Sequence, residues 1–243
     1  MIQLHLIGIG TGNPDHLTRQ AVKALNAADL VMIPRKGGKA DLAELRRAIC
    51  AEVVTNPATR IVEFDLPVRD AATPDYEAGV NLWHDAIADV WQATMAAHPC
   101  QVVALLVWGD PSLYDSTLRI AARLKDVSVS VVPGITSIQA LTAAHRVPLN
   151  EIGAAVTITT GRQLLQGWPD GTDTLVIMLD GNCSFQSLDP KGISIWWGAY
   201  VGMPEQIILS GALAEVGAQI VEMRAKAREA HGWIMDIYIL RRG

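Results

Sequence analysis

Residues 102–117 read VVALLVWGDPSLYDST, a continuous apolar run that stops abruptly at Gly109-Asp110-Pro111. The run is typical of a strand buried on both faces, as in the centre of a parallel sheet. An apolar-periodic segment beginning near Leu118 predicts a helix after the turn. In open α/β sheets ligands bind at the carboxyl ends of strands, so this turn is a candidate binding loop. The simpler alternative is that Gly109 and Pro111 only shape the turn and Asp110 caps the helix.

The order of the elements predicts an α/β protein with two α/β domains and an active-site cleft between them. Residues 1–134 alternate strand and helix, as βαβ units do, and residues 135–243 are richer in strands and predict a mixed sheet. In the first half we expect strands at 2–9, 30–33, 61–65, 102–108 and 127–132, and helices at 17–28, 41–51 and 75–97. In the second half we expect strands at 154–160, 173–179, 193–201, 205–213 and 233–242, and a helix at 214–230.

Composition limits the classes of function. Half of the 243 residues are hydrophobic and the formal net charge is −5, which does not suggest binding to nucleic acid. Three isolated cysteines favour a reducing compartment over disulfides or a zinc site, and no histidine pair has metal-ligand spacing. No signal peptide or membrane-length apolar run is visible. We therefore expect a cytoplasmic protein that binds neither metal nor membrane.

The glycine-rich start GIGTGNP, residues 8–14, resembles a dinucleotide-binding fingerprint only in part. That fingerprint requires a third glycine where Asn13 stands, and an acidic residue after the second strand, which instead ends in Pro34-Arg35-Lys36. We therefore do not predict a nicotinamide cofactor. Two interpretations remain open: the glycines allow close packing in a tight turn, or they let the backbone approach another ligand.

Five segments together resemble the tetrapyrrole (corrin and porphyrin) methylase family over essentially the whole chain. They are GIGTGNPDHLT (8–18), WGDPSLYDS (108–116), VPGITS (132–137), DTLVIML (173–179) and GMPEQIILSGAL (202–213). Each pattern is weak alone, whereas five in the same order and spacing are specific. The chain departs from many members in the opening turn, where Thr11 and Asn13 replace proline and aspartate.

Within this family, other segments are most similar to the deacetylating members that act on precorrin-5. These segments are KADLAELRRAIC (39–50), WHDAIADVW (83–91), TLVIMLDGN (174–182), IWWGAYVGMPEQ (195–206) and HGWIMDIYILRR (231–242). The resemblance implies methylation of C-1 of precorrin-5 by S-adenosylmethionine, with loss of the extruded acetyl group as acetate, giving precorrin-6A. It also implies a homodimer. Two alternative functions remain open: the protein is another methylase of the family, or it binds a corrinoid without catalysis.

The same resemblance implies a set of residues around S-adenosylmethionine. They are Thr11 in the first loop, Gly109, Asp110 and Leu113 on the methionine-ribose side, Thr136 and Ser137 in the next loop, and Met178 and Gly202 around the adenine. The residue types suit these roles, because glycines expose backbone hydrogen-bonding groups and methionine packs on flat rings. The Asp110 carboxylate is expected either to oppose the sulfonium charge or to accept a hydrogen bond from the ammonium group.

Catalysis is expected to rest mainly on positioning, since the methyl donor is already activated. Hydrolysis of the acetyl group requires an activated water, so a general base is expected near the strand-end loops. The candidates are Asp15, His16, Asp110, Tyr114 and Asp180, of which Asp110 and Tyr114 are our predicted catalytic residues. The substrate carboxylates need cations, for which Arg35, Lys36, Lys39, Arg119 and Arg162 are candidates, whereas Arg46 and Arg47 are expected on a solvated helix face.

Overall fold

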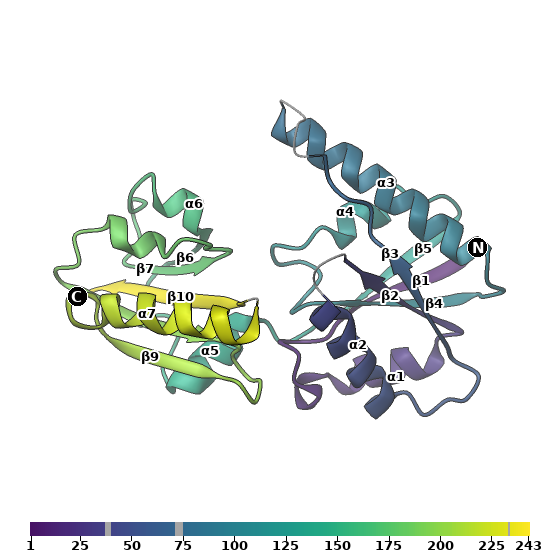
Figure 1. Ribbon diagram of the computed structural model, residues 1–243, viewed down its shortest axis with the longest axis horizontal. Helices are drawn as coiled ribbons and strands as arrows, with labels where there is room; N and C mark the ends of the chain where they lie inside the picture. Colours follow the sequence, from purple (N-terminus) through teal and green to yellow (C-terminus); the bar gives the residue numbers. More distant parts are fainter. Residues whose placement is uncertain (37–39, 71–74, 233) are drawn as a thin grey trace. The chain divides into compact units, whose positions relative to one another are not determined.

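The computed structural model describes residues 1–36, 40–70, 75–232 and 234–243. The chain folds into two compact units, Met1–Thr136 (unit 1) and Ser137–Gly243 (unit 2). In Figure 1 unit 1 carries the purple to teal elements and unit 2 the teal to yellow ones, beginning with α5. Each unit has its own sheet and its own core, and each is described separately below.

Unit 1 is built on a parallel sheet. Its described strands are β1 (Ile2–Gly8), β2 (Leu30–Arg35), β3 (Arg60–Asp65), β4 (Val102–Val107) and β5 (Val127–Val132), and they lie in the order β3-β2-β4-β1-β5. The prediction of a central strand at 102–108 is confirmed, since β4 pairs in parallel with both β1 and β2 and is almost entirely buried. All five strands therefore end at the same edge of the sheet.

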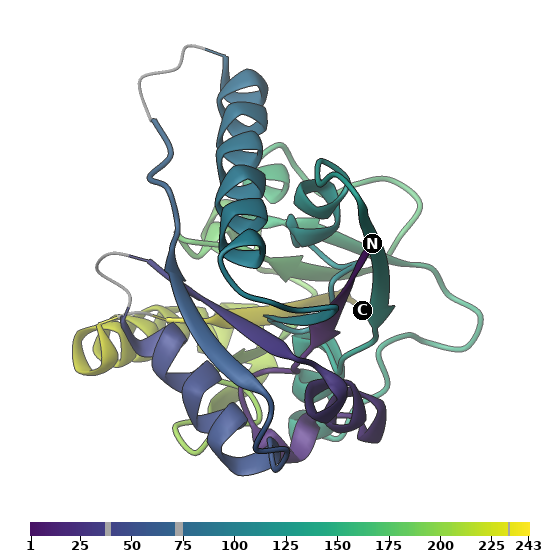
Figure 2. The same cartoon turned by 90° about the vertical axis from the view of Figure 1, so that its right-hand side faces the viewer.

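Helices cover both faces of this sheet (Figures 1 and 2). The helical elements of unit 1 are η1 (Pro14–His16), α1 (Arg19–Ala27), α2 (Ala40–Val53), α3 (Tyr76–Ala96) and α4 (Thr117–Ala121). α3 and α4 pack with Leu4 and Leu6 of β1 in one apolar cluster, whereas α1 and α2 pack with Ile7 in another. Alternate side chains of a strand point to opposite faces, so β1 is apolar on both sides.

Two expected boundaries of unit 1 were wrong. The strand at 30–33 continues through Pro34 to Arg35, and Pro34 pairs with Phe64 of β3. Proline is tolerated there because β2 pairs with β4 only at 30–32, so no ladder hydrogen bond is required from position 34 on that side. The first helix begins at Arg19, after Thr18, whose hydroxyl accepts a hydrogen bond from Ala21 N at 3.0 Å as an N-cap.

Unit 2 contains a mixed sheet, as the strand-rich sequence predicted. The described strands are β6 (Val156–Thr160), β7 (Thr174–Met178), β8 (Ile193–Ala199), β9 (Ile207–Ala212) and β10 (Asp236–Arg242), in the order β6-β7-β10-β8-β9. Only the β6–β7 pair is parallel among these described strands. The helical elements are α5 (Ser137–His145), α6 (Gly161–Leu164), η2 (Ser184–Ser187) and α7 (Leu213–His231). Leu213 and Ile220 of α7 pack on Trp197 and Tyr238 in the apolar core of this unit.

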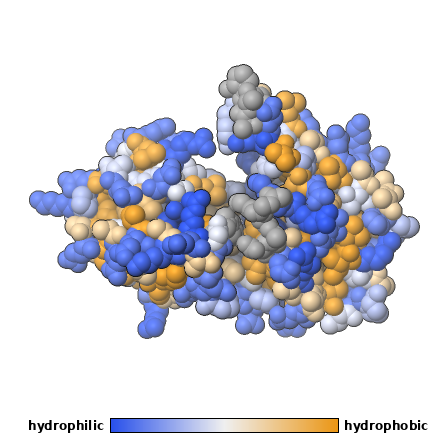
Figure 3. Space-filling view, in the orientation of Figure 1, coloured by the Kyte–Doolittle hydropathy of each residue, from blue (hydrophilic) through white to orange (hydrophobic). Residues whose placement is uncertain are grey.

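The visible face of each unit mixes hydrophilic and hydrophobic side chains (Figure 3). Among the described residues, no helix combines the length and the apolar character needed to cross a bilayer. The buried apolar residues lie in the cores formed between the sheets and the helices that cover them.

Acid should destabilise the protein through His84 of α3. This side chain is 3% exposed, and neither ring nitrogen has a hydrogen-bond partner among the described residues. Burial, with the charges of Arg123 and Arg119, lowers the pKa of His84 below its ordinary 6.5 against the opposing charge of Asp85. The unfolded chain therefore takes up this proton first, so the histidine's contribution to stability is complete above pH 6.5 and declines below it.

Urea unfolding at pH 7.5, 6.5 and 5.5 measures this loss, with a limiting slope of about 1.4 kcal/mol per pH unit for one proton. His84→Met should flatten the slope, whereas His98→Met, on a partly exposed residue, should leave it unchanged. An unaltered slope in His84→Met would show that other groups cause the acid sensitivity.

Candidate functional site

The glycine-rich loop and the Gly-Asp-Pro loop are joined directly by backbone hydrogen bonds. Gly109 N donates to Gly10 O at 2.8 Å, and Gly10 N donates to Gly109 O at 3.3 Å. Both residues have positive φ, +70° for Gly10 and +60° for Gly109, a conformation that L side chains rarely adopt. The loops that follow β1 and β4 thus form one continuous surface at the carboxyl edge of the sheet.

The loop after β5 joins this junction through Gly134. A Cβ atom on Gly134 would overlap Gly109 O and would lie 2.8 Å from Gly8 Cα. A Cβ on Gly8 would in turn lie 2.6 Å from Gly134 N. Gly8 and Gly134 are therefore required for close packing of three loops, which is the structural interpretation of the first glycine. Gly109 differs, because a Cβ there would meet only Thr136 Cα, at 3.9 Å.

Asp110 links two of these loops with its carboxylate. Oδ2 accepts a hydrogen bond from Gly134 N at 2.9 Å, and Oδ1 accepts from Ser112 N at 2.8 Å and from the Ser112 hydroxyl. Partial burial acts to raise the pKa of Asp110, but these hydrogen bonds outweigh it and lower the pKa below 3.8. Asp110 is therefore an anion at neutral pH, fixed beside the glycine junction.

The other expected residues of unit 1 lie in the same loops. Thr11 is buried, and its hydroxyl is 3.2 Å from Nδ1 of His16. Leu113 N donates to Asp110 O at 3.2 Å, which closes the turn after Pro111. Tyr114 follows with φ of +48° and a side chain that is 44% exposed. The structure thus brings together Thr11, Gly109, Asp110, Leu113, Tyr114 and Thr136 at one edge of unit 1.

The remaining expected residues belong to unit 2. Ser137 is the first residue of α5, and Met178 is the last residue of β7. Gly202 has φ of +81°, and its N–H donates to the Gln206 side chain at 2.8 Å. The sequence did not single out Leu179, which follows Met178 with φ of +53° and a side chain 68% exposed. A bulky residue held in this conformation and exposed is the strained feature typical of ligand sites.

Asp180 is a structural residue, which contradicts its candidacy as a base. Its carboxylate is buried and accepts hydrogen bonds from Tyr238 Oη at 2.6 Å, Ser184 N at 2.6 Å, Ser184 Oγ at 2.9 Å and Asn182 N at 3.0 Å. Burial acts to raise the pKa of Asp180, but the hydrogen bonds lower it overall. An ionised carboxylate with both oxygens occupied is a poor acceptor for a proton from water.

Several other candidates are already engaged. Asp15 lies in η1, where its backbone N–H donates to Asn13 Oδ1 at 2.9 Å. Arg35 pairs with Asp65 at 2.9 Å and lies 3.6 Å from Glu63, and Arg119 donates to Asp115 O at 3.1 Å. Lys39 lies outside the described residues.

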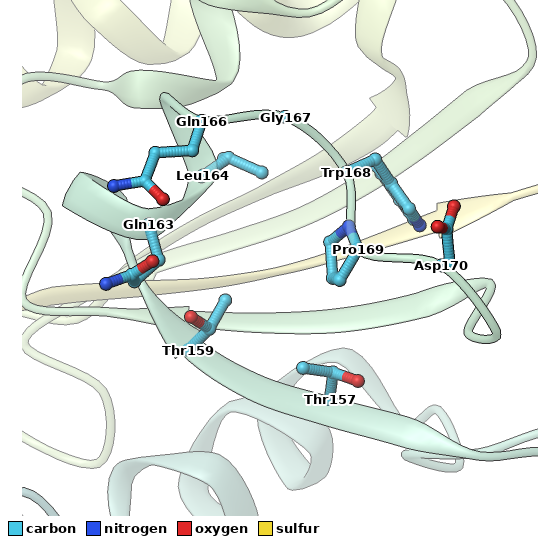
Figure 4. A pocket seen from close by; sticks show the side chains of 9 residues that line it. All are labelled: Thr157, Thr159, Gln163, Leu164, Gln166, Gly167, Trp168, Pro169 and Asp170. Carbon is cyan, nitrogen blue, oxygen red and sulfur yellow. The ribbon is translucent and has the colours of Figure 1, made fainter.

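A separate pocket lies in unit 2 beside β6 and α6 (Figure 4). It has a volume of about 310 Å³, and it is lined by Thr157, Thr159, Gln163, Leu164, Gln166, Gly167, Trp168, Pro169 and Asp170. None of the residues expected to bind the cofactor lines it. Within the described part of the chain, no group of three His, Cys, Asp or Glu side chains is arranged to hold a metal ion.

Comparisons with known proteins agree with the loop motifs. Residues 3–217 match the sequence model of the family described as Tetrapyrrole (Corrin/Porphyrin) Methylases. A Sinorhizobium protein named precorrin-6A synthase [deacetylating] is 49% identical over 251 aligned residues, covering 100% of this chain and 96% of that protein.

Solved structures give the same fold. A cobalamin-synthesis-related protein (CobF) from Corynebacterium diphtheriae has a TM-score of 0.85 and 38% identity, covering 100% of this chain and 99% of that one. A uroporphyrin-III C-methyltransferase from Thermus thermophilus, complexed with S-adenyl homocysteine, has a TM-score of 0.62 and 22% identity, covering 98% and 92%. These structures confirm the predicted α/β fold class. With the family match over residues 3–217, they show that the chain belongs to the tetrapyrrole (corrin/porphyrin) methylase family.

Proposed function

We propose that this methylase transfers a methyl group from S-adenosylmethionine to C-1 of precorrin-5 and releases the extruded acetyl group as acetate, giving precorrin-6A. The observation that carries the proposal is 49% identity, over the whole chain, to a relative named precorrin-6A synthase [deacetylating]. The subfamily segments of the sequence point to the same reaction. They include the buried tract 174–178 and the terminal strand 236–242. These two segments are far apart in sequence but pair with each other in the sheet of unit 2.

The loop junction of unit 1 fits a cationic cofactor. S-adenosylmethionine supplies a methyl group already activated on a positive sulfur. Asp110 contributes a fixed negative charge, and its pKa is lowered without any bound cation, so the carboxylate is ionised before binding. Gly109 leaves open space beside its Cα and presents bare backbone there. We assign Thr11, Leu113, Thr136, Ser137, Met178 and Gly202 to the remainder of the cofactor site, and we add Leu179 on the basis of its strained, exposed position.

In the proposed reaction, positioning of the reactants contributes more to methylation than proton transfer does. The macrocycle carbon is electron-rich, so alignment of donor and acceptor carries the methylation step, and alignment can contribute several kcal/mol, about 7 at the lower end for well-oriented reactants. Asp110, with its lowered pKa, orients and stabilises charge better than it removes protons. Tyr114 is the better candidate for the deacetylation step, because its exposed phenol lies at the end of the same loop and can donate a hydrogen bond to the acetyl carbonyl.

We further propose, by analogy with the family, that the protein works as a cytoplasmic homodimer and that it binds neither nucleic acid nor membrane. The formal net charge of −5 supports the statement about nucleic acid. Light scattering coupled to size-exclusion chromatography measures the oligomeric state directly, with a dimer expected at twice the 26.2 kDa chain mass.

The substrate assignment is tested with a panel of tetrapyrroles and methyl-labelled S-adenosylmethionine. We expect label in precorrin-5, generated in situ, with kcat/KM at least about 100-fold above that for precorrin-2 or uroporphyrinogen III, a ratio equivalent to about 2.7 kcal/mol. Preference for another member of the panel would show that the protein is a methylase acting on a different tetrapyrrole. Tight tetrapyrrole binding without any label transfer would support the non-catalytic alternative.

A further inference from the structure

Arg46 of α2 is buried against the end of β4, just before the Gly-Asp-Pro loop, and not on the solvated helix face expected from the sequence. The side chain is 8% exposed. Its Nε donates to Leu106 O near the end of β4 at 3.2 Å, and Nη1 donates to Leu42 O at 3.2 Å. Its guanidinium carbon lies 5.4 Å from the ring centroid of Trp108, the residue before Gly109. Arg46 is therefore fixed at the carboxyl edge of the sheet, where the candidate cofactor loops begin.

This buried cation has no paired carboxylate in the part of the chain that the structure describes. Among the described residues, no Asp or Glu oxygen lies within 4.0 Å of the Arg46 guanidinium. Burial lowers the pKa of Arg46 to about 10, and the more distant charge of Asp115 only partly opposes the effect. Asp115 is itself occupied, since its Oδ1 accepts from Thr117 N at 2.6 Å and from the Thr117 hydroxyl. Buried charges are normally paired, so an unpaired arginine at a ligand edge requires an explanation.

Part of the guanidinium remains available to a ligand. Nε and Nη1 use backbone carbonyls, whereas Nη2 makes no hydrogen bond to any described residue. Nη2 is not fully buried, so this unused donor keeps some solvent-accessible surface. Trp108 and the two carbonyls hold the guanidinium plane in place, which reduces the entropy lost when an anion binds.

We propose that Arg46 binds a ligand carboxylate at the edge of the Gly-Asp-Pro loop. The inference rests on the proposed function, in which both ligands carry carboxylates: the acidic side chains of the tetrapyrrole and the amino-acid group of S-adenosylmethionine. A planar guanidinium is suited to this group, because it can offer parallel N–H donors to both oxygens. The ligand anion supplies the charge that no carboxylate of the described residues places within pairing distance.

The test compares Arg46→Met with Arg47→Met. Arg47 is the neighbouring residue and pairs on the surface with Glu44 and Glu63, which makes it a matched control. Loss of a charged hydrogen bond to the ligand should weaken binding by about 10- to 100-fold in Arg46→Met. Thermal unfolding measures the structural cost of the substitution separately, because Arg46→Met also removes the hydrogen bonds to Leu106 O and Leu42 O. Arg46→Lys, which keeps the charge without the fork, should bind with intermediate affinity.

The KM for precorrin-5 and the Kd for S-adenosylhomocysteine together identify which ligand supplies the carboxylate. A rise in KM for precorrin-5 with an unchanged Kd for S-adenosylhomocysteine assigns Arg46 to the tetrapyrrole, and the reverse assigns it to the cofactor. A folded Arg46→Met with both constants within twofold of those of the parent would overturn the proposal, as would equal effects in Arg47→Met. Lost stability with unchanged binding would instead make Arg46 a structural residue. If the parent protein fails to methylate precorrin-5, the proposed function fails, and the cofactor measurement still tests Arg46 independently.

Discussion

Gly134→Ala should reduce affinity for S-adenosylhomocysteine by at least about 100-fold and lower the melting temperature. The added Cβ would overlap Gly109 O and press on Gly8 Cα at 2.8 Å. Every obstructing atom belongs to backbone, so no side chain can rotate away, and such overpacking typically costs about 1–3 kcal/mol or more. Separating the loops also breaks the hydrogen bond from Gly134 N to Asp110, which removes the fixed carboxylate from its position.

Isothermal titration with S-adenosylhomocysteine and a thermal melt measure the two effects of this substitution. Gly181→Ala is the matched control, because a Cβ there meets nothing within 4 Å and its φ is not in the left-handed range. Parental affinity in Gly134→Ala would show that the three-loop junction does not shape the cofactor site.

Asp180→Ala should destabilise the protein by about 3–5 kcal/mol while leaving the chemistry of any folded enzyme intact. The substitution leaves the Tyr238 hydroxyl and Ser184 N buried without their acceptor. Gly161 packs so closely on the carboxyl group that a Cβ there would overlap it, and the alanine variant leaves a cavity at that contact. Tyr238→Phe removes a single hydrogen bond and should cost less, about 1–2 kcal/mol.

Urea unfolding at pH 7 measures these losses, and Asp189→Ala, on an exposed loop residue, is the control. The lowered pKa of Asp180 fixes the pH dependence: its contribution is complete above the ordinary value of 3.8 and disappears as the pH falls through the lowered pKa. A stable Asp180→Ala variant that methylates but releases no acetate would contradict the structural role and restore Asp180 as the base.

The parts of the fold that depend on local pattern were predictable. The apolar run of β4 and the alternation of strands and helices in unit 1 follow from periodicity alone. The convergence of the loops at Gly10, Gly109 and Gly134 also follows, because parallel strands end at one edge of a sheet. The resemblance to a known family then gave these loops a function that no single turn could indicate.

The features that depend on distant residues were not predictable. Asp180 was a candidate general base on sequence because Tyr238, which donates to its carboxylate, is 58 positions away. Pro34 was read as the end of a strand because the pairing that spares its missing N–H is set by strand order. The left-handed backbone of Tyr114 and Leu179 has no sequence signal, since neither is a residue type that favours it.

Arg46 did carry a signal that the pair Arg46-Arg47 obscured. Ala43 and Ile49 lie three residues before and after it, and both are buried against the sheet. That spacing places Arg46 on the apolar stripe of the helix and Arg47 on the polar side. A charged residue on such a stripe is a candidate ligand contact.

In the proposed reaction, one chain both methylates precorrin-5 and removes its acetyl group. The most direct measurement is a single turnover with precorrin-5 and methyl-labelled S-adenosylmethionine, in which tetrapyrrole mass and free acetate are followed together. We expect a product that has gained one labelled methyl group and lost its acetyl group, with acetate appearing in equal amount. A methylated product that retains the acetyl group, with no acetate formed, would contradict this proposal.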